Sequence, residues 1–201
     1  MRVLIGLGTA AVALGVWALA AGSLLGADEA KKEGVNVGDK APLFEAKDDH
    51  GKEWKSADHV GKKLLVIYFY PGDLTGGCTK QACGFRDDMH HLADKGVQVI
   101  GVSGDSVKNH QLFKKVHKLN FTLLADEDGE IAKKFGVPFS QGGKAKAKDA
   151  EGNDVDLTRG VTIKRWTFII GKDGNIIYKD SNVSPATDSK KILEVIEREG
   201  K

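Results

Sequence analysis

Residues 64–87 read LLVIYFYPGDLTGGCTKQACGFRD, and this stretch decides the fold. Its first part, 64–70, is a continuous apolar and aromatic run, typical of a strand buried on both faces of a sheet. Pro71 and Gly72 end that strand. Apolar side chains then recur at three- and four-residue spacing, which predicts a helix over 76–94. The apolar positions of this helix are Ala82, Phe85, Met89 and Leu92. A buried strand followed by an amphipathic helix indicates an α/β fold.

The segments on either side continue this alternation. Strands are expected at 97–102, 121–124, 166–170 and 176–179, and helices at 107–118, 126–135 and 189–198. A small hairpin is expected over 39–54, ahead of the buried strand. The polar, lysine-rich residues 140–160 are interpreted as a solvated surface loop inserted before the last two strands. The pattern predicts an α/β domain with a central mixed β-sheet flanked by helices and an N-terminal β-hairpin extension.

The first 27 of the 201 residues have a different character. Arg2 precedes an uncharged apolar run over 3–27, which indicates a cleaved secretory signal or a retained membrane anchor. Either interpretation places the rest of the chain outside the cytoplasm, periplasmic or secreted. We expect a linker over 28–34 and one domain over 35–201. Acidic and basic residues are interspersed at a net charge of +2, without the basic stripe that nucleic-acid binding requires.

The chain has only two cysteines, Cys78 and Cys83. A disulfide between them would close a very small loop and stabilise the fold little, so a purely structural bridge explains them poorly. Cys78 falls in the first turn of the predicted helix, where free amides and the helix dipole favour a thiolate. Five residues along an ideal helix separate Cα atoms by about 8.6 Å, beyond the roughly 7 Å limit for a disulfide. The pair is therefore predicted to alternate between thiols on an intact helix and a disulfide on a locally unwound one.

The segment FYPGDLTGGCTKQACGFRD resembles the active-site segment of the peroxiredoxins, and most closely the peroxiredoxin Q or bacterioferritin-comigratory type. The family pattern P-x-x-x-T-x-x-C falls on Pro71, Thr75 and Cys78. The resolving cysteine of many members falls on Cys83, and the active-site arginine falls on Arg165 in KRWTFII. The resemblance extends from about Val35 to Glu199 and includes the segments VGDKAPLF, VIGVSGDS and FTLLADEDGEIAKKFGV.

The resemblance implies a thioredoxin-like fold and the reduction of hydrogen peroxide and organic hydroperoxides, without a cofactor or metal. Cys78 would attack the peroxide and become a sulfenic acid, and Arg165 would stabilise the thiolate and the developing charge. Thr75 would orient the peroxide, and Pro71 would shield the sulfur from water. Cys83 would then form a disulfide with Cys78, which a thioredoxin-like donor would reduce. The resemblance also favours a monomer.

Two positions depart from the family pattern, and structural roles remain alternatives for several residues. Gly76 stands where a proline is common, and Gln81 where an acidic residue is common. Thr75 could simply cap the helix, Pro71 could end the strand, and Arg165 could be a surface charge. Arg86 is interpreted as an ion-pair partner. We expect the scattered histidines His50, His59, His110 and His117 to be exposed, and no metal shared by His90 and His91.

Two other functions for an exported thioredoxin-like protein are considered. A copper-binding protein would use two thiols and a distal histidine, but its cysteines usually have three residues between them, whereas four lie between Cys78 and Cys83. A thiol–disulfide exchange protein favours Cys-x-x-Cys, which this chain lacks. The sequence therefore favours the peroxidase.

Overall fold

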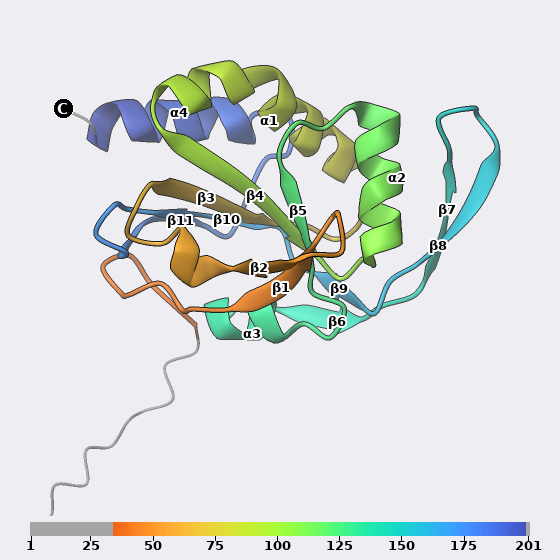
Figure 1. Cartoon of the computed structure of the whole chain (residues 1–201), viewed down its shortest axis with the longest axis horizontal. Helices are drawn as coiled ribbons and strands as arrows, with labels where there is room; N and C mark the ends of the chain where they lie inside the picture. Colours follow the sequence, from red (N-terminus) through yellow and green to blue (C-terminus); the bar gives the residue numbers. More distant parts are fainter. Residues whose placement is uncertain (1–33, 200–201) are drawn as a thin grey trace, which may run out of the picture. The chain divides into compact units, whose positions relative to one another are not determined.

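The computed structural model describes residues 34–199, which form an α/β structure around a seven-stranded sheet (Figure 1). The order of strands in the sheet is β11-β10-β3-β4-β5-β1-β2. These strands are β1 (Glu45–Asp48), β2 (Glu53–Lys55), β3 (Leu64–Phe69), β4 (Val97–Ser103), β5 (Thr122–Ala125), β10 (Trp166–Ile170) and β11 (Ile176–Asp180). The helices are η1 (Ser56–Asp58), α1 (Gly76–Asp94), α2 (Val107–His117), α3 (Glu130–Phe135) and α4 (Asp188–Glu199).

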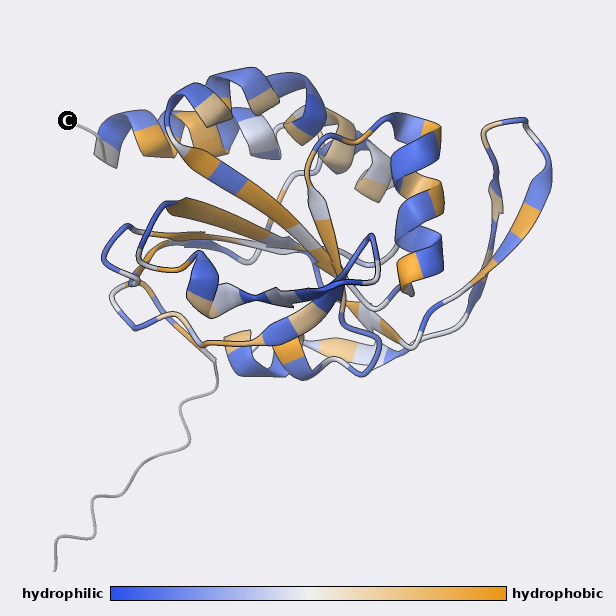
Figure 2. Cartoon of the chain, viewed as in Figure 1, coloured by the Kyte–Doolittle hydropathy of each residue, from blue (hydrophilic) through white to orange (hydrophobic). Residues whose placement is uncertain are grey.

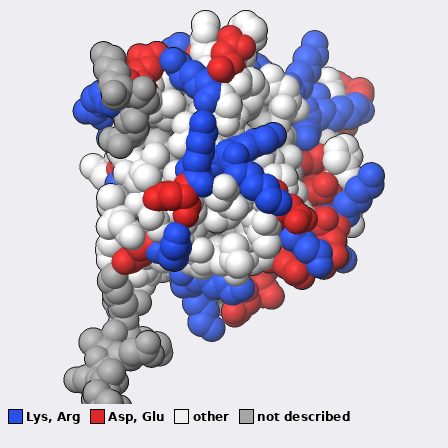
Figure 3. All heavy atoms as spheres, turned by 60° about the vertical axis from the view of Figure 1, so that its left-hand side comes forward, with Lys and Arg blue, Asp and Glu red and all other residues white. Residues whose placement is uncertain are grey.

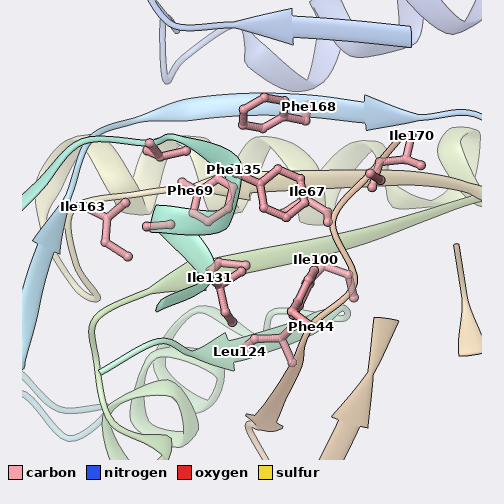
Figure 4. Packing of buried hydrophobic residues seen from close by; sticks show 14 of the residues in the cluster. Phe44, Ile67, Phe69, Ile100, Leu124, Ile131, Phe135, Ile163, Phe168 and Ile170 are labelled. Carbon is pink, nitrogen blue, oxygen red and sulfur yellow. The ribbon is translucent and has the colours of Figure 1, made fainter. Parts of the chain in front are cut away.

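Strand β3 lies in the middle of the sheet and is buried on both faces, as its sequence predicts. Leu65, Ile67 and Phe69 pack with α3 on one face, in the cluster seen in Figure 4. Val66 and Tyr68 alternate with them and pack with α1, α2 and α4 on the other face. Figure 2 shows apolar strands inside and mostly polar outer surfaces on the helices. Two hydrophobic clusters, one on each side of the sheet, therefore hold β3 in place along its length.

The sheet is mixed, which confirms the prediction. β3, β4 and β5 run parallel to one another, whereas β10 runs antiparallel to β3 and pairs with β11. The β1–β2 hairpin extends the same sheet, because β1 pairs antiparallel with β5. The chain therefore leaves the carboxyl end of β3 and enters α1 at the edge where ligands bind in such sheets.

Two expectations about secondary structure are wrong. Residues 140–160 are not a plain loop: β7 (Lys144–Lys148) and β8 (Asp154–Thr158) form a β-hairpin, which we call the arm. Its base adjoins a second small sheet of β6 (Phe139–Gln141) and β9 (Val161–Ile163). The helix expected over 126–135 begins only at Glu130. The Asp126 carboxylate accepts hydrogen bonds from the amides of Ile131 and Ala132, so the preceding residues turn instead.

The segments predicted as signal or anchor and most of the linker lie outside the described residues. Within 34–199, none of the helices is both long and apolar enough to cross a membrane. On the face shown in Figure 3, basic and acidic side chains lie next to each other, with several basic ones near its centre. This face carries no extended field of one sign.

Helices α1 and α4 are joined by a buried carboxylate. Asp88 of α1 accepts a hydrogen bond of 2.8 Å from the Ser189 hydroxyl and one of 2.6 Å from the Lys190 ammonium. Burial raises the pKa of Asp88, but the hydrogen bonds from Lys190 and Ser189 lower it by more, so the net pKa lies below the ordinary value. This contact holds the start of α4 against α1.

Asp88→Asn is expected to lower the free energy of unfolding by about 1 kcal/mol at pH 7, because the amide keeps the Ser189 contact and loses the charge. Since the folded pKa of Asp88 is depressed, its stabilising effect is present above the ordinary value of 3.8 and is lost as the pH falls through the folded pKa. In urea unfolding, the free energy of unfolding of the wild-type protein should exceed that of Asp88→Asn by a constant amount from pH 7 to about pH 5. This excess should shrink below about pH 4. The exposed Asp94→Asn is the control. A difference that grows on acidification would contradict the assignment.

Candidate active site

Cys78 lies at the amino end of α1, immediately after the loop that leaves β3. Thr75 is the N-cap residue of this helix, so Cys78 is the third helical residue. Its side chain is almost fully buried, at 1% exposure, and it is a free thiol. Because unpaired amides and the helix dipole face this end of α1, a negative charge on the sulfur is favoured there. The predicted place of Cys78 in a first helical turn is confirmed.

Arg165 directly precedes β10, the strand that lies beside β3, and from there its side chain reaches Cys78. Trp166, the next residue, pairs with Phe69 at the end of β3, so the register brings Arg165 next to the loop. Its Nη2 donates to the Cys78 sulfur at 3.2 Å. The same nitrogen lies over Gly77, where a Cβ would be only 3.4 Å from it. The structure thus joins two sequence-predicted site residues that are 87 positions apart.

The orientation of the Arg165 guanidinium is fixed by a chain of side chains that the sequence did not reveal. Arg165 Nη1 donates to the side-chain carbonyl of Gln81. Gln81 Nε2 donates to Asp188 at 2.7 Å, and Thr167 Oγ1 donates to the same carboxylate oxygen at 2.9 Å. Burial raises the pKa of Asp188, and the hydrogen bonds from Gln81 and Thr167 only partly oppose this. Gln81 therefore serves as a neutral bridge between the arginine and α4.

The loop between β3 and α1 carries Pro71 and Thr75. The Thr75 hydroxyl does not cap α1; it donates instead to the carbonyl of Gly72 at 3.0 Å. This bond uses the hydroxyl proton, so the oxygen lone pairs stay free to accept a hydrogen bond. Leu74 has φ 56°, a left-handed conformation that costs a leucine about 1 kcal/mol or more. The half-buried Pro71 begins this tightly wound loop.

Cys83 lies on α1 five residues after Cys78 and is partly exposed. Both cysteines are free, and α1 is continuous from Gly76 to Asp94. The structure therefore contains the intact-helix arrangement predicted for the dithiol form.

The loop between β3 and α1 is held by a buried polar network that includes His110. The prediction that His110 is exposed is therefore wrong. His110, expected to be exposed, is fully buried, and its Nδ1 lies 2.8 Å from an Asp73 carboxylate oxygen. Tyr70 donates to the other oxygen at 2.7 Å. Burial lowers the pKa of His110, but the Asp73 carboxylate more than offsets this, so the net pKa is raised. A lone histidine in a polar stretch gave no local signal of burial.

His59 and His117, expected to be exposed, are half-buried, because their rings pack against Trp54 and Phe113. Arg86 donates to the Asp87 carboxylate and to the His117 carbonyl, a structural role. Among residues 34–199, no three His, Cys, Asp or Glu side chains gather as a metal site would require.

Comparisons with known proteins show which family this chain belongs to. The model of the AhpC/TSA family matches residues 37–179, a span that contains both cysteines and Arg165. The chain belongs to the AhpC/TSA family. It is 41% identical over 143 residues to peroxiredoxin Bcp of Bacillus subtilis, covering 71% of this chain and 83% of that protein.

This AhpC/TSA-family protein is also similar in structure to solved peroxiredoxins. Peroxidoxin BcpB from Mycobacterium tuberculosis aligns with a TM-score of 0.67 and 29% identity, over 82% of this chain and 97% of that one. Peroxiredoxin Q of Xanthomonas campestris aligns with a TM-score of 0.64 and 28% identity, over 79% and 92%. The thioredoxin-like fold and the resemblance to the peroxiredoxin Q and Bcp type are thereby confirmed.

Proposed function

We propose that the protein is a thiol-dependent peroxidase in which Cys78 is oxidised by the substrate and Cys83 resolves the product. The observation that carries this proposal is the Cys78 sulfur at a helix amino terminus, 3.2 Å from Arg165 Nη2. Its relationship to peroxiredoxin Bcp and peroxiredoxin Q supports the same chemistry.

In the first step, the Cys78 thiolate attacks one oxygen of the peroxide and the O–O bond breaks. The sulfur is oxidised to a sulfenic acid, and the leaving oxygen takes a proton to become water or an alcohol. Arg165 stabilises the thiolate before the reaction and the charge on the separating oxygens during it. Thr75 Oγ1, whose own proton goes to the Gly72 carbonyl, accepts a hydrogen bond from the peroxide O–H. Pro71 limits the access of water to the sulfur.

In the second step, the Cys83 thiol displaces water from the sulfenic acid and a Cys78–Cys83 disulfide forms. Because both residues lie on α1, this step requires the first turns of the helix to unwind. A dithiol donor of the thioredoxin type then returns both cysteines to thiols with two electrons and two protons. No metal or organic cofactor takes part in this cycle.

A single-turnover experiment tests this proposal. The reduced protein is mixed with one equivalent of hydrogen peroxide, peroxide loss is followed by stopped flow, and the intact mass is then measured. We expect loss much faster than with an ordinary free thiol and a product lighter by two hydrogen atoms. Loss at the rate of a free thiol would contradict the peroxidase assignment. If peroxide is lost rapidly but the protein gains one oxygen and loses no hydrogen, Cys78 keeps its role as the nucleophile. The role of Cys83 as the resolving thiol would then be rejected.

Arg165→Lys is expected to slow the reaction with peroxide by about 100-fold, because one ammonium cannot contact both the sulfur and Gln81 as the planar guanidinium does. The measurement is the second-order rate constant of the first turnover. Arg86→Lys is the matched control, since Arg86 also donates to a carbonyl but stands apart from the thiol. Equal rate constants in Arg165→Lys and the wild-type protein would exclude Arg165 from the step.

We also propose that the enzyme works outside the cytoplasm. The support is the uncharged run over 3–27 behind Arg2, which lies outside the described residues. Fractionation of cells that express the full chain, followed by mass analysis of its amino terminus, tests this and separates cleavage from anchoring. Recovery of the intact chain from the soluble cytoplasm would contradict it.

A further inference from the structure

The arm is fixed to the domain at its base. Arg159, directly after β8, forms a β-bridge with Asp105, and the Gly160 amide donates to the Gly104 carbonyl at 2.9 Å. The glycines allow this close approach: a Cβ on Gly104 would overlap the Val161 carbonyl, and one on Gly160 would overlap the Glu127 carbonyl. The backbone at Arg159 is therefore held beside the end of β4.

From this base, the Arg159 side chain reaches the loop that precedes the active-site helix. Its Nη1 donates to the Pro71 carbonyl at 3.2 Å, and its guanidinium covers Gly72 so closely that a Cβ there would overlap it. The side chain is only 9% exposed, and its Nε lies 3.6 Å from the fully buried Asp105 carboxylate. Nε and Nη2 are buried without a hydrogen-bond partner. A charged group at this depth is unfavourable unless its contacts offset the loss of water.

Asp105 holds the other side of the same loop. Its carboxylate accepts a hydrogen bond of 2.8 Å from the Asp73 amide, and further bonds from the Ser103 hydroxyl at 2.9 Å and from Asn109 Nδ2 at 3.0 Å. Arg159 therefore fixes the carbonyl before Gly72, and Asp105 fixes the amide after it. The Gly72 carbonyl between them is the acceptor that orients the Thr75 hydroxyl.

We propose that Arg159 is a positioning residue of the peroxidase reaction, which sets the Gly72 carbonyl and thereby the Thr75 hydroxyl that receives the peroxide. This inference rests on the proposed function. The role needs arginine, because the planar guanidinium reaches both Pro71 and Asp105 while it covers Gly72, which a lysine ammonium cannot do. Arg159, at the base of the arm, thus gives the active-site loop a contact that comes from outside residues 71–87.

The test uses proteins that carry Cys83→Ser, so that Cys78 is the only thiol. Arg159→Lys and Arg159→Met are compared with the parent in two reactions of Cys78: one turnover with hydrogen peroxide, and alkylation by iodoacetamide. We expect the peroxide rate constant to fall by about tenfold or more while alkylation changes less than about twofold, since alkylation does not use Thr75. If the rate constants for peroxide and for iodoacetamide fall by the same factor, Arg159 has only a structural role and the inference is wrong. An unchanged peroxide rate in both variants would also overturn the inference.

A double-mutant cycle with Thr75→Val examines the route of the effect. If Arg159 acts through Thr75, Arg159→Lys should slow the Thr75→Val protein by less than about twofold. If the fold-losses in the peroxide rate constant from Arg159→Lys and Thr75→Val multiply in the double variant, Arg159 does not act through Thr75. Arg86→Lys is the control and should leave both rates unchanged. If the parent reacts with peroxide no faster than a free thiol, the proposed function itself fails. A fast parent whose Arg159 variants are equally fast rejects only the inference.

Discussion

Cys78→Ser is expected to lose reaction with peroxide by about 10⁴-fold or more, because the sulfur supplies the attacking electron pair and a serine hydroxyl stays protonated at neutral pH. Serine is slightly smaller and fits the buried position, and its oxygen still accepts the hydrogen bond from Arg165. The environment of the site therefore remains while the nucleophile is lost. The measurement is stopped-flow peroxide loss with one equivalent of hydrogen peroxide.

The matched control is Cys83→Ser, which removes the other thiol of the same helix and should keep the rapid first reaction. Circular dichroism and the midpoint of urea unfolding should show that Cys78→Ser is folded. Rapid peroxide loss in folded Cys78→Ser would assign the attack to Cys83, which is partly exposed, rather than to the sulfur that Arg165 contacts. That result would contradict the arrangement proposed for the cycle.

The elements with continuous patterns could be predicted from the sequence. The run over 64–70 has apolar side chains at every position, so burial on both sheet faces follows directly, and β3 confirms it. Helix α1 occupies the predicted 76–94. In both cases the signal is local, because each residue's own type and spacing decides its burial.

In the arm, the high lysine content obscured the alternating pattern of a strand. KAKAK over 144–148 alternates lysine with alanine, and the alanines are the less exposed partners in β7. This is the two-residue period of a strand, but the lysine content and flanking glycines favoured a loop. The missed site residues have another cause. Asp188, His110, Asp105 and Arg159 meet the active-site loop or α1 only through contacts between distant segments, and no local spacing marks them. Thr167 joins the same site at one remove, through its hydrogen bond to Asp188.

Cys83→Ser is expected to consume one equivalent of peroxide and then stop, with turnover by a thioredoxin-type donor reduced by about 100-fold or more. The reason lies in the helix. About 8.6 Å between Cα atoms five residues apart must shrink below about 7 Å before a disulfide forms, so the first turns of α1 must unwind. Gly76 and Gly77 lie in that first turn, and glycine favours the helical backbone less than alanine because it loses more conformational freedom. The end of α1 that holds Cys78 is therefore also the end that unwinds most readily.

The product identifies which step has failed. In Cys83→Ser, the intact mass should rise by one oxygen, and a sulfenic-acid trap such as dimedone should add to Cys78, because no thiol is left to displace the hydroxide. Wild-type protein treated in the same way should lose two hydrogens and resist the trap. Sustained turnover of Cys83→Ser at the wild-type rate would mean that the donor attacks the sulfenic acid directly. Unwinding of α1 would then be dispensable, and the glycines at its start would need another explanation.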